Sequence, residues 1–232
     1  MPEPERLILF DIDGTLLNTG GAGIAALRQG FERAFPQQAA EMPELDLAGA
    51  TDSGLTINIF RHAEIVPSEA NRQAFYQAYL HHLAENLEAF DGRLLPGIIE
   101  LLELLSGLQR VTLGLLTGNI ERGAKLKIDH FGIGHHFGSG AYGDDHHDRD
   151  ELGPIAIQRA AEATGKQFAS EHVFVLGDTV KDIRCARAAG AQAIAVATGG
   201  IPRAELEAHA PDSLFDDFAD TPEVLRSLGL QE

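Results

Sequence analysis

Two kinds of hydrophobic pattern alternate along much of the chain. Residues 7–10 read LILF, a continuous apolar run typical of a strand buried on both faces of a sheet. After residue 96, similar runs alternate with segments whose apolar residues recur every three or four positions, as in a helix. The expected strands are 111–116, 137–141, 172–177 and 191–196, and the expected helices are 97–106, 120–130, 152–164 and 179–189, followed over 203–228 by a helix, a short strand and a helix. This alternation predicts an α/β fold, a Rossmann-like, mostly parallel sheet with helices on both faces.

Residues 20–90 interrupt the alternation, because their pattern is that of helices throughout. The expected helices are 22–35, roughly 52–64 and 67–90. Glycines precede this stretch, and the turn-forming sequence FDGRLLPG follows it. An inserted helical domain on two linkers has this appearance. We therefore predict a catalytic core domain formed by 1–18 and 91–232, and a helical cap domain formed by 19–90.

Polar residues follow three of the expected strands at the points where they end. DIDGT follows the first strand, TGN follows strand 111–116, and Asp178 follows strand 172–177, with Asp182 four residues further on. Because ligands of an open parallel sheet bind beyond the carboxyl ends of its strands, these residues are expected to converge in one crevice. Carboxylates packed so closely need a cation between them. Hard oxygen ligands with room for water suit Mg²⁺.

Composition narrows the range of partners. The 232-residue chain has a formal net charge of −17 at pH 7, so neither nucleic acid nor an anionic membrane is expected to bind it. Cys185 is the only cysteine; no intrachain disulfide can form, and a cytoplasmic location is expected. The apolar run before Asp11 is too short for a signal peptide, and no stretch has membrane-spanning length. An acidic chain that handled phosphate would need a metal or local cations at its site.

The three motifs DIDGT, LLTGN and GDTVKD, in this order, resemble those of the haloacid dehalogenase superfamily of phosphohydrolases. The similarity is strongest to the phosphoglycolate-phosphatase-like branch and covers nearly the whole chain, including a helical cap inserted after the first strand. It implies a Mg²⁺-dependent phosphatase that hydrolyses small phosphomonoesters, phosphoglycolate-like or sugar phosphates, through an aspartyl-phosphate. The partner would be a small phosphorylated metabolite, and the protein a monomer or a homodimer.

The resemblance also implies a role for each motif residue. Asp11 would be the nucleophile, Asp13 the general acid and base, and Thr117 a hydrogen-bond donor to the phosphoryl oxygens. The backbone carbonyl of Asp13 would ligate the metal, and Asp182 would support the metal shell. The implied metal site as a whole is Asp11, Asp13, Asp178 and Asp182, and the implied substrate contacts are Gly14, Thr15, Gly118 and Asn119.

Phosphoryl-transfer chemistry gives an independent reason for two acids separated by one apolar residue. The transfer requires mainly positioning and neutralisation of the phosphoryl oxygens. A carboxylate can attack phosphorus once a metal screens the repulsion between the two anions. The leaving oxygen then needs a proton, and later the attacking water must lose one. A second carboxylate can do both, typically for about 10²–10⁴-fold in rate.

One element departs from the pattern of the family. Relatives in this branch usually place a lysine followed by a proline ahead of the last aspartate motif. Here that region reads GDDHHDRDELGP, residues 143–154, and contains no lysine. Arg149 lies at the right place and is our candidate for this cation, because a guanidinium stays charged and can hold an oxyanion with two donors. Lys181 is the alternative candidate.

Other patterns have simpler interpretations. DDHHDRDE at 144–151 offers metal ligands, but adjacent histidines seldom point at one ion, and the same holds for His81 and His82. GSGAYG at 138–143 matches the dinucleotide fingerprint by letter but runs into an acidic loop. Cys185 is expected to be a small buried residue. GATDSG at 49–54 is either a substrate contact or a plain helix-capping loop.

Two rival functions come from different classes. A phosphomutase of the same superfamily would retain the phosphate on a sugar instead of releasing it. A receiver-type signalling module also combines an acidic cluster with Mg²⁺, but it lacks a helical insertion after its first strand and a second acid two residues beyond the phosphorylated aspartate. The phosphatase is therefore the leading hypothesis.

Overall fold

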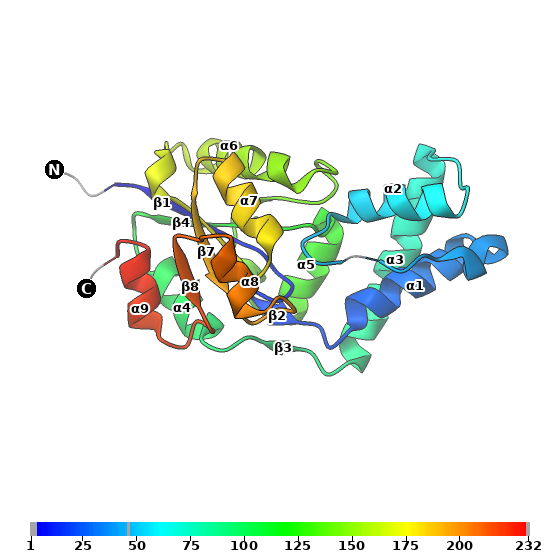
Figure 1. Ribbon diagram of the computed structural model, residues 1–232, viewed down its shortest axis with the longest axis horizontal. Coiled ribbons are helices and arrows are strands. Elements are labelled where there is room, and N and C mark those ends of the chain that lie inside the picture. The colour runs from blue at the N-terminus through cyan, green and yellow to red at the C-terminus, as the bar shows by residue number, and fades with distance from the viewer. Residues whose placement is uncertain (1–3, 46, 231–232) are drawn as a thin grey trace.

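The computed structural model describes residues 4–45 and 47–230 and contains a six-stranded sheet (Figure 1). Each neighbouring pair of strands is parallel, in the order β5-β4-β1-β6-β7-β8. The strands are β1 (Arg6–Phe10), β4 (Val111–Leu116), β5 (Ser139–Ala141), β6 (Val173–Gly177), β7 (Gln192–Val196) and β8 (Ser213–Phe215). The α/β fold and the mostly parallel sheet expected from the sequence are confirmed.

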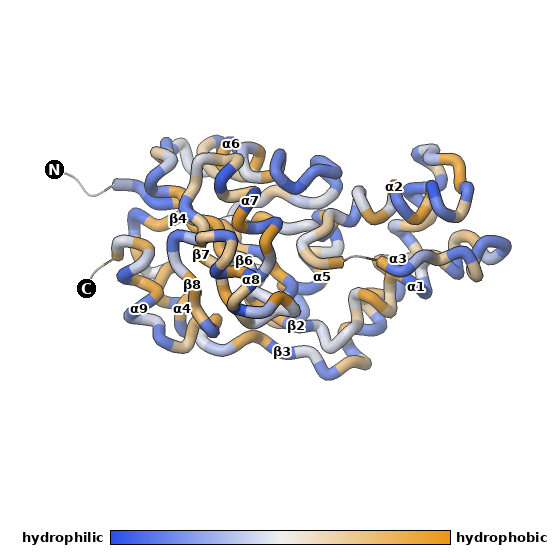
Figure 2. Tube along the Cα trace, in the orientation of Figure 1, coloured by the Kyte–Doolittle hydropathy of each residue, from blue (hydrophilic) through white to orange (hydrophobic). Residues whose placement is uncertain are grey.

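Helices cover both faces of this sheet, so the sheet lies at the apolar centre (Figure 2). On one face Ile8 and Phe10 pack with α4 (Ile98–Ser106), α5 (Glu121–His130) and α9 (Thr221–Ser227). On the other face Leu7 and Leu9 pack with α6 (Leu152–Thr164), α7 (Val180–Ala188) and α8 (Arg203–Ala208). Both faces of β1 are thus buried, which explains its unbroken apolar run. We call the sheet with these helices the sheet layer.

Three further helices form a separate layer to the right of the sheet in Figure 1. They are α1 (Ala22–Ala34), α2 (Asp52–His62) and α3 (Glu69–Ala89), with a 3₁₀ turn, η1 (Pro36–Glu41), between the first two. Their core is aromatic: Phe31 and Phe75 meet edge to face with ring centroids 6.2 Å apart, and Phe35 and Phe60 do so at 5.4 Å. We call residues 22–89 the helical layer. Where the chain leaves and re-enters the sheet layer, β2 (Leu17–Asn18) pairs antiparallel with β3 (Arg93–Leu94).

The expectation that residues 20–90 are wholly helical is wrong for one segment. Residues 42–45 and 47–51 carry no helix. Pro43 has no N–H with which to continue a helix, and Gly49 adopts a φ of +57°, a conformation that favours glycine. Part of this segment runs over the sheet layer and reaches the candidate site described below.

The order of the strands places a switch point at β1. From β1 the chain adds β4 and β5 on one side, and it later adds β6, β7 and β8 on the other. Ligands bind at such points, beyond the carboxyl ends of the strands. Among the described helices, none combines the length and the apolar character needed to cross a membrane.

Candidate active site

The carboxyl ends of β1 and β6 bring three aspartates together. Asp11 follows β1, Asp178 follows β6, and Asp182 lies in the first turn of α7. All three are buried, and one carboxylate oxygen of each lies within 4.8 Å of the others. The residues that sequence patterns placed in one crevice therefore do meet.

The charges in this cluster oppose one another. Burial, together with the nearby carboxylates of Asp182 and Asp11, raises the pKa of Asp178 to about 8. Burial also raises the pKa of Asp11 to about 6, while Arg149 opposes the shift. Three hard oxygen donors whose charges repel are a donor set that fits Mg²⁺, because a divalent ion would relieve this repulsion.

Arg149 lies inside the cluster rather than on the surface. Its Nη2 atom is 3.0 Å from Asp11 Oδ1 and also donates to Asp182 Oδ1. Burial opposes its charged form, but Asp182 and Asp11 outweigh burial and raise its pKa, so the guanidinium stays charged. Its Nε atom is buried without a hydrogen-bond partner. The structure thus places a fixed cation beside the oxygen of Asp11.

Asp182 holds Thr179 and Arg149 in place. Its Oδ2 atom accepts hydrogen bonds from the backbone N–H of Thr179 at 3.0 Å and from the Thr179 hydroxyl at 2.6 Å, and Thr179 in turn caps α7. Its Oδ1 atom accepts from Arg149. The carboxylate therefore fixes the start of α7 and the guanidinium at the same time.

Asp13 belongs to a second polar group next to the cluster. Lys127 Nζ lies 2.8 and 2.6 Å from its two carboxylate oxygens. Asn119 Nδ2 donates to Asp13 Oδ2 at 2.8 Å and to Thr117 Oγ1 at 2.9 Å, and Asn119 Oδ1 accepts from Lys127 at 2.7 Å. Asp13 keeps 43% of its side-chain surface exposed, so its carboxylate can still meet a substrate.

Lys127 is the residue of this group that sequence reasoning missed. It is buried, on the same side of α5 as Ala124 and Ile128. A lysine on the apolar face of a helix is the signal that could have revealed it, because burying an ammonium group is costly unless it is paired. Its pairing with Asp13 joins α5 to the end of β1.

The remaining motif residues lie around the same strand ends. Gly14 has a φ of +83°, and a Cβ atom there would collide with the carboxylate of Asp178. The buried hydroxyl of Thr15 donates to Asp178 Oδ1 at 3.2 Å. Thr117 is fully buried at the end of β4. Gly118 leaves room for the helical layer, since a Cβ atom would collide with the carbonyl oxygen of Ala50.

The start of α2 binds the helical layer to the sheet layer. The backbone N–H of Asp52 donates to the Gly118 carbonyl at 2.7 Å, and Asp52 Oδ2 accepts from the Ile120 N–H at 2.8 Å. The hydroxyl of Ser53 donates to the Gly143 carbonyl, and that of Thr51 donates to the His147 carbonyl at 2.6 Å. GATDSG therefore does more than cap a helix, since it crosses between the two layers.

A cavity of about 610 Å³ lies between the layers at this point. Its sheet-layer lining includes Asp11, Asp13, Gly14, Thr117, Gly118, Asn119, Lys127, Arg149 and Asp178. Its helical-layer lining includes Ile24, Leu27, Asp52, Leu55 and Tyr79. A cavity of this size suits a small molecule.

Lys181 lines a different cavity. This second cavity measures about 890 Å³, and Arg61 and Arg184 also line it. Arg149 and Gly49 line both cavities, whereas Lys181 is not in the lining of the one that holds Asp11. Of the two candidate cations, the structure places Arg149 against Asp11.

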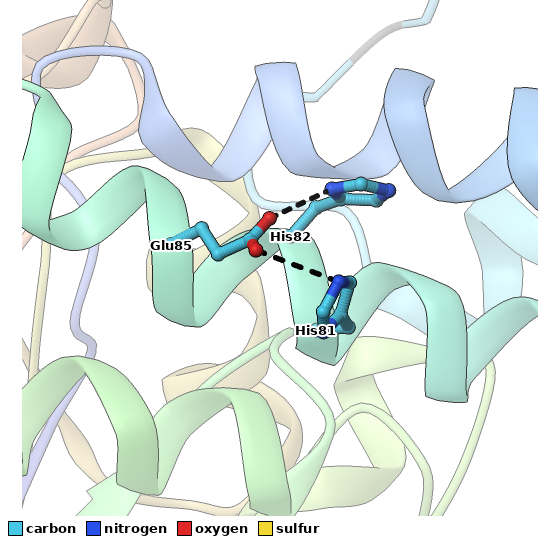
Figure 3. Close-up of side chains that lie close together, drawn as sticks. All are labelled: His81, His82 and Glu85. Atoms are coloured by element: carbon cyan, nitrogen blue, oxygen red, sulfur yellow. Dashed lines mark ion pairs between the residues drawn. The ribbon is translucent and has the colours of Figure 1, made fainter.

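The other sequence patterns lie away from the strand ends or form no ligand group. In the stretch 144–151, Asp145 pairs with Arg159 at 2.6 Å and Asp148 caps a 3₁₀ turn, and the described residues there form no metal-ligand cluster. His81 and His82 on α3 both point at Glu85, 3.6 and 3.3 Å away (Figure 3). One ligand atom of each of the three lies within 4.8 Å of the others, on one helix of the helical layer and away from the strand ends. No helix begins directly after GSGAYG, which contains β5. Cys185 is buried, as expected.

Comparison with known proteins agrees with this arrangement. Residues 8–196 match the protein family described as haloacid dehalogenase-like hydrolase. A phosphoglycolate phosphatase of Agrobacterium fabrum is 29% identical over 228 residues, which cover 96% of this chain and 93% of that protein. A 5′-nucleotidase of Pseudomonas aeruginosa is also 29% identical and covers 95% of each chain.

A solved structure shows the same fold. The crystal structure of CbbY from Rhodobacter sphaeroides, in complex with phosphate, superposes with a TM-score of 0.72 and covers 97% of this chain and 100% of that chain. Its sequence identity is 20%, so the likeness concerns the fold. The layered arrangement described above is therefore one that other proteins share.

Proposed function

The chain belongs to the haloacid dehalogenase-like hydrolase family and is a phosphatase, and from this premise we propose that it hydrolyses small phosphomonoesters through an aspartyl-phosphate on Asp11. The observation that carries the proposal is the place of Asp11. It lies at the switch point of the sheet, beside two further carboxylates and 3.0 Å from a buried guanidinium. A carboxylate held there can attack phosphorus while fixed positive charge balances the phosphoryl oxygens.

Asp13 is the proposed general acid and base. Its carboxylate is partly exposed and held by Lys127 and Asn119, so it has one orientation at the mouth of the cavity. It would protonate the leaving alkoxide during formation of the aspartyl-phosphate and then take a proton from the attacking water. Thr117, at the end of β4, would donate to a phosphoryl oxygen.

Asp11, Asp178 and the Asp13 carbonyl would hold Mg²⁺, with Asp182 in support. The ion would screen the carboxylates from the phosphate when bound, which lets two anions approach one another. The mutual repulsion of Asp11, Asp178 and Asp182 supports this assignment, as does their shared 4.8 Å cluster. Gly14, Thr15, Gly118 and Asn119 would line the phosphate.

We also propose that residues 19–90 act as a cap domain over a core formed by 1–18 and 91–232. Two features support this boundary. The helical layer has an aromatic core of its own, and the β2–β3 pair lies where the chain enters and leaves it. Such a cap would exclude water from the cavity during attack by Asp11. The single buried cysteine supports a reducing, cytoplasmic setting.

Phosphate release from p-nitrophenyl phosphate tests the proposal. We expect turnover with Mg²⁺, near-complete loss with excess EDTA, and recovery when Mg²⁺ is restored. Asp11→Asn should abolish both turnover and the covalent phosphoprotein. Full activity in chelator would overturn the metal assignment, and wild-type turnover in Asp11→Asn would overturn the nucleophile. Transfer of phosphate within a sugar phosphate, without release, would favour a phosphomutase.

A further inference from the structure

Asp52 is an acid in the active-site cavity for which the proposed chemistry has no use. Among the residues that the structure describes, four acids line that cavity: Asp11, Asp13, Asp52 and Asp178. Of these four, Asp52 comes from the helical layer, where it is the first residue of α2. Because the phosphoryl group must lie against Asp11 on the sheet layer, a helical-layer side chain lining the same cavity is placed to meet the leaving group.

Two hydrogen bonds fix the position of Asp52, one made by its backbone and one by its side chain. Its N–H donates to Gly118 at 2.7 Å, and its Oδ2 atom accepts from Ile120 at 2.8 Å. The second of these bonds does not need a negative charge, since an amide oxygen would accept it equally well. Burial raises the pKa of Asp52 to about 6, and the Ile120 N–H and the charge of Lys127 oppose this shift only in part. The start of α2 and Lys127 thus make the negative charge less costly without requiring it.

The cations of the cavity are already engaged. Among the described residues that line it, Lys127 and Arg149 are the basic ones. Lys127 binds Asp13 and Asn119, and Arg149 binds Asp11 and Asp182. A carboxylate or a second phosphate on the leaving group would find no cation of its own there and would face Asp52. The cost of such a like-charge approach in a partly desolvated cleft is substantial.

The other described side chains of the helical-layer lining carry no charge. They include the apolar Ile24, Leu27 and Leu55, together with the phenol side chain of Tyr79. Burial raises the pKa of Tyr79 well above its usual value, so this hydroxyl stays protonated. Such a wall suits a short carbon chain with hydroxyl groups, one of which can donate to the Asp52 carboxylate.

We propose that Asp52 selects phosphomonoesters whose leaving group is uncharged and bears a hydroxyl, as in polyol or sugar phosphates, and rejects those that carry a carboxylate or second phosphate. This rests on the proposed phosphatase function and narrows its substrate class. The name of the Agrobacterium relative points to phosphoglycolate, whose leaving group is anionic. The two proteins would then share the phosphate chemistry and differ in the selected leaving group.

Matched substrate pairs test the proposal. Phosphoglycolate and 2-hydroxyethyl phosphate have the same length and differ in a carboxylate against a hydroxymethyl group; 3-phosphoglycerate and glycerol 1-phosphate form a second pair. The kcat/KM of the wild-type enzyme should favour the neutral member of each pair by at least about tenfold at fixed ionic strength. Phosphate release from p-nitrophenyl phosphate, measured alongside, reports whether the phosphatase chemistry itself is present.

Two variants separate the local charge from general effects. Asp52→Asn keeps the acceptor for Ile120 and should bring the neutral-to-anionic ratio close to one, mainly through faster turnover of the anionic member. Asp144→Asn is the matched control, because Asp144 Oδ1 accepts from the neighbouring Glu121 N–H at 3.0 Å but does not line the cavity. Its ratio should stay at the wild-type value.

The outcomes are distinct. Hydrolysis of p-nitrophenyl phosphate with a wild-type preference for the anionic members would overturn the role of Asp52 while the phosphatase stands. An equal change of the ratio in Asp52→Asn and Asp144→Asn would also overturn it, because overall charge would then suffice. Much faster turnover of ethanolamine phosphate than of 2-hydroxyethyl phosphate would mean that Asp52 selects an ammonium group, and it would overturn the proposal that the leaving group is uncharged. Failure on every phosphomonoester would remove the phosphatase and this inference together.

Discussion

The sheet layer and the helical layer share one cavity but bring different chemistry to it. The sheet layer contributes charges that hold one another, with Arg149 between two carboxylates and Lys127 on Asp13. The described part of the helical layer contributes mostly apolar side chains and the charge of Asp52. Each layer also has its own apolar core. Substitutions in the sheet layer should therefore impair phosphoryl transfer itself, and those in the helical layer should change which leaving group is accepted.

Among variants that keep the proposed nucleophile Asp11, the largest effect is expected for Asp13→Asn. Its kcat on an alkyl phosphate should fall about 10²–10⁴-fold, because the poor leaving group needs the proton that Asp13 supplies. The loss on p-nitrophenyl phosphate should be clearly smaller, since that leaving group needs less protonation. Steady-state rates on the two substrates check this, and equal losses on both would contradict the role of Asp13 as the acid.

The next largest effect is expected for Arg149→Ala, which should lower kcat/KM at least about tenfold on every substrate. Arg149→Lys should recover part of this loss, since it restores the charge but not the two-pronged geometry. Lys181→Ala, on the other cavity, serves as control and should be nearly silent. If Lys181→Ala lost activity while Arg149→Ala kept it, the catalytic cation would be Lys181 and not Arg149.

The stability of the metal-free protein should depend on Asp178. The pKa of Asp178 is raised to about 8 in the folded chain, above its value in the unfolded chain. Between these two values the folded chain binds a proton that the unfolded chain has lost. The free energy of unfolding therefore falls as the pH rises through this range. Asp178→Asn removes this titration, so its free energy of unfolding should fall less between pH 5 and pH 8, by about 3–4 kcal/mol. Urea denaturation in chelator measures it. Identical pH dependence in both proteins would contradict the raised pKa.

The smallest effects are expected for a matched pair of core substitutions. Phe75→Leu and Phe10→Leu each remove one edge-to-face ring pair, at 6.2 and 6.0 Å, and each should lower the free energy of unfolding by about 1–2 kcal/mol. Phe10 directly precedes Asp11, so only Phe10→Leu should also lower the kcat of the folded enzyme. An equal loss of kcat in both would remove the distinction between the layers.

The parts of this molecule that follow from sequence are those fixed by local pattern and sheet topology. The runs at 7–10 and 111–116 have too few residues for buried helices, and they form β1 and β4 within one residue of expectation. Once the sheet is parallel, the residues after its strands must lie at one edge, which brings Asp11 and Asp178 together. The candidate cation Arg149 has another origin, since it is selected through the resemblance to a family whose members place a lysine in that region.

Other parts depend on contacts between distant segments. The place of Lys127 on the apolar face of α5 is a local signal, but its partner Asp13 is far away in sequence, so no local pattern reveals the pair. The irregular segment before Thr51 is set by its packing on the sheet layer. A helix-capping residue and a substrate contact give the same sequence pattern around Asp52. The two interpretations can be distinguished only from the structure, which shows the bond from the Ile120 N–H and the cavity that Asp52 lines.

The place of Cys185 has a consequence for the redox behaviour of the enzyme. Its thiol is buried against the site, donates to the Arg149 carbonyl at 3.1 Å, and has a pKa raised by burial to about 12. Since oxidants and alkylating reagents attack the thiolate, this sulfur is protected as long as its surroundings are closed. The rate at which a thiol reagent labels the protein therefore measures how often the packing between α6 and α7 opens.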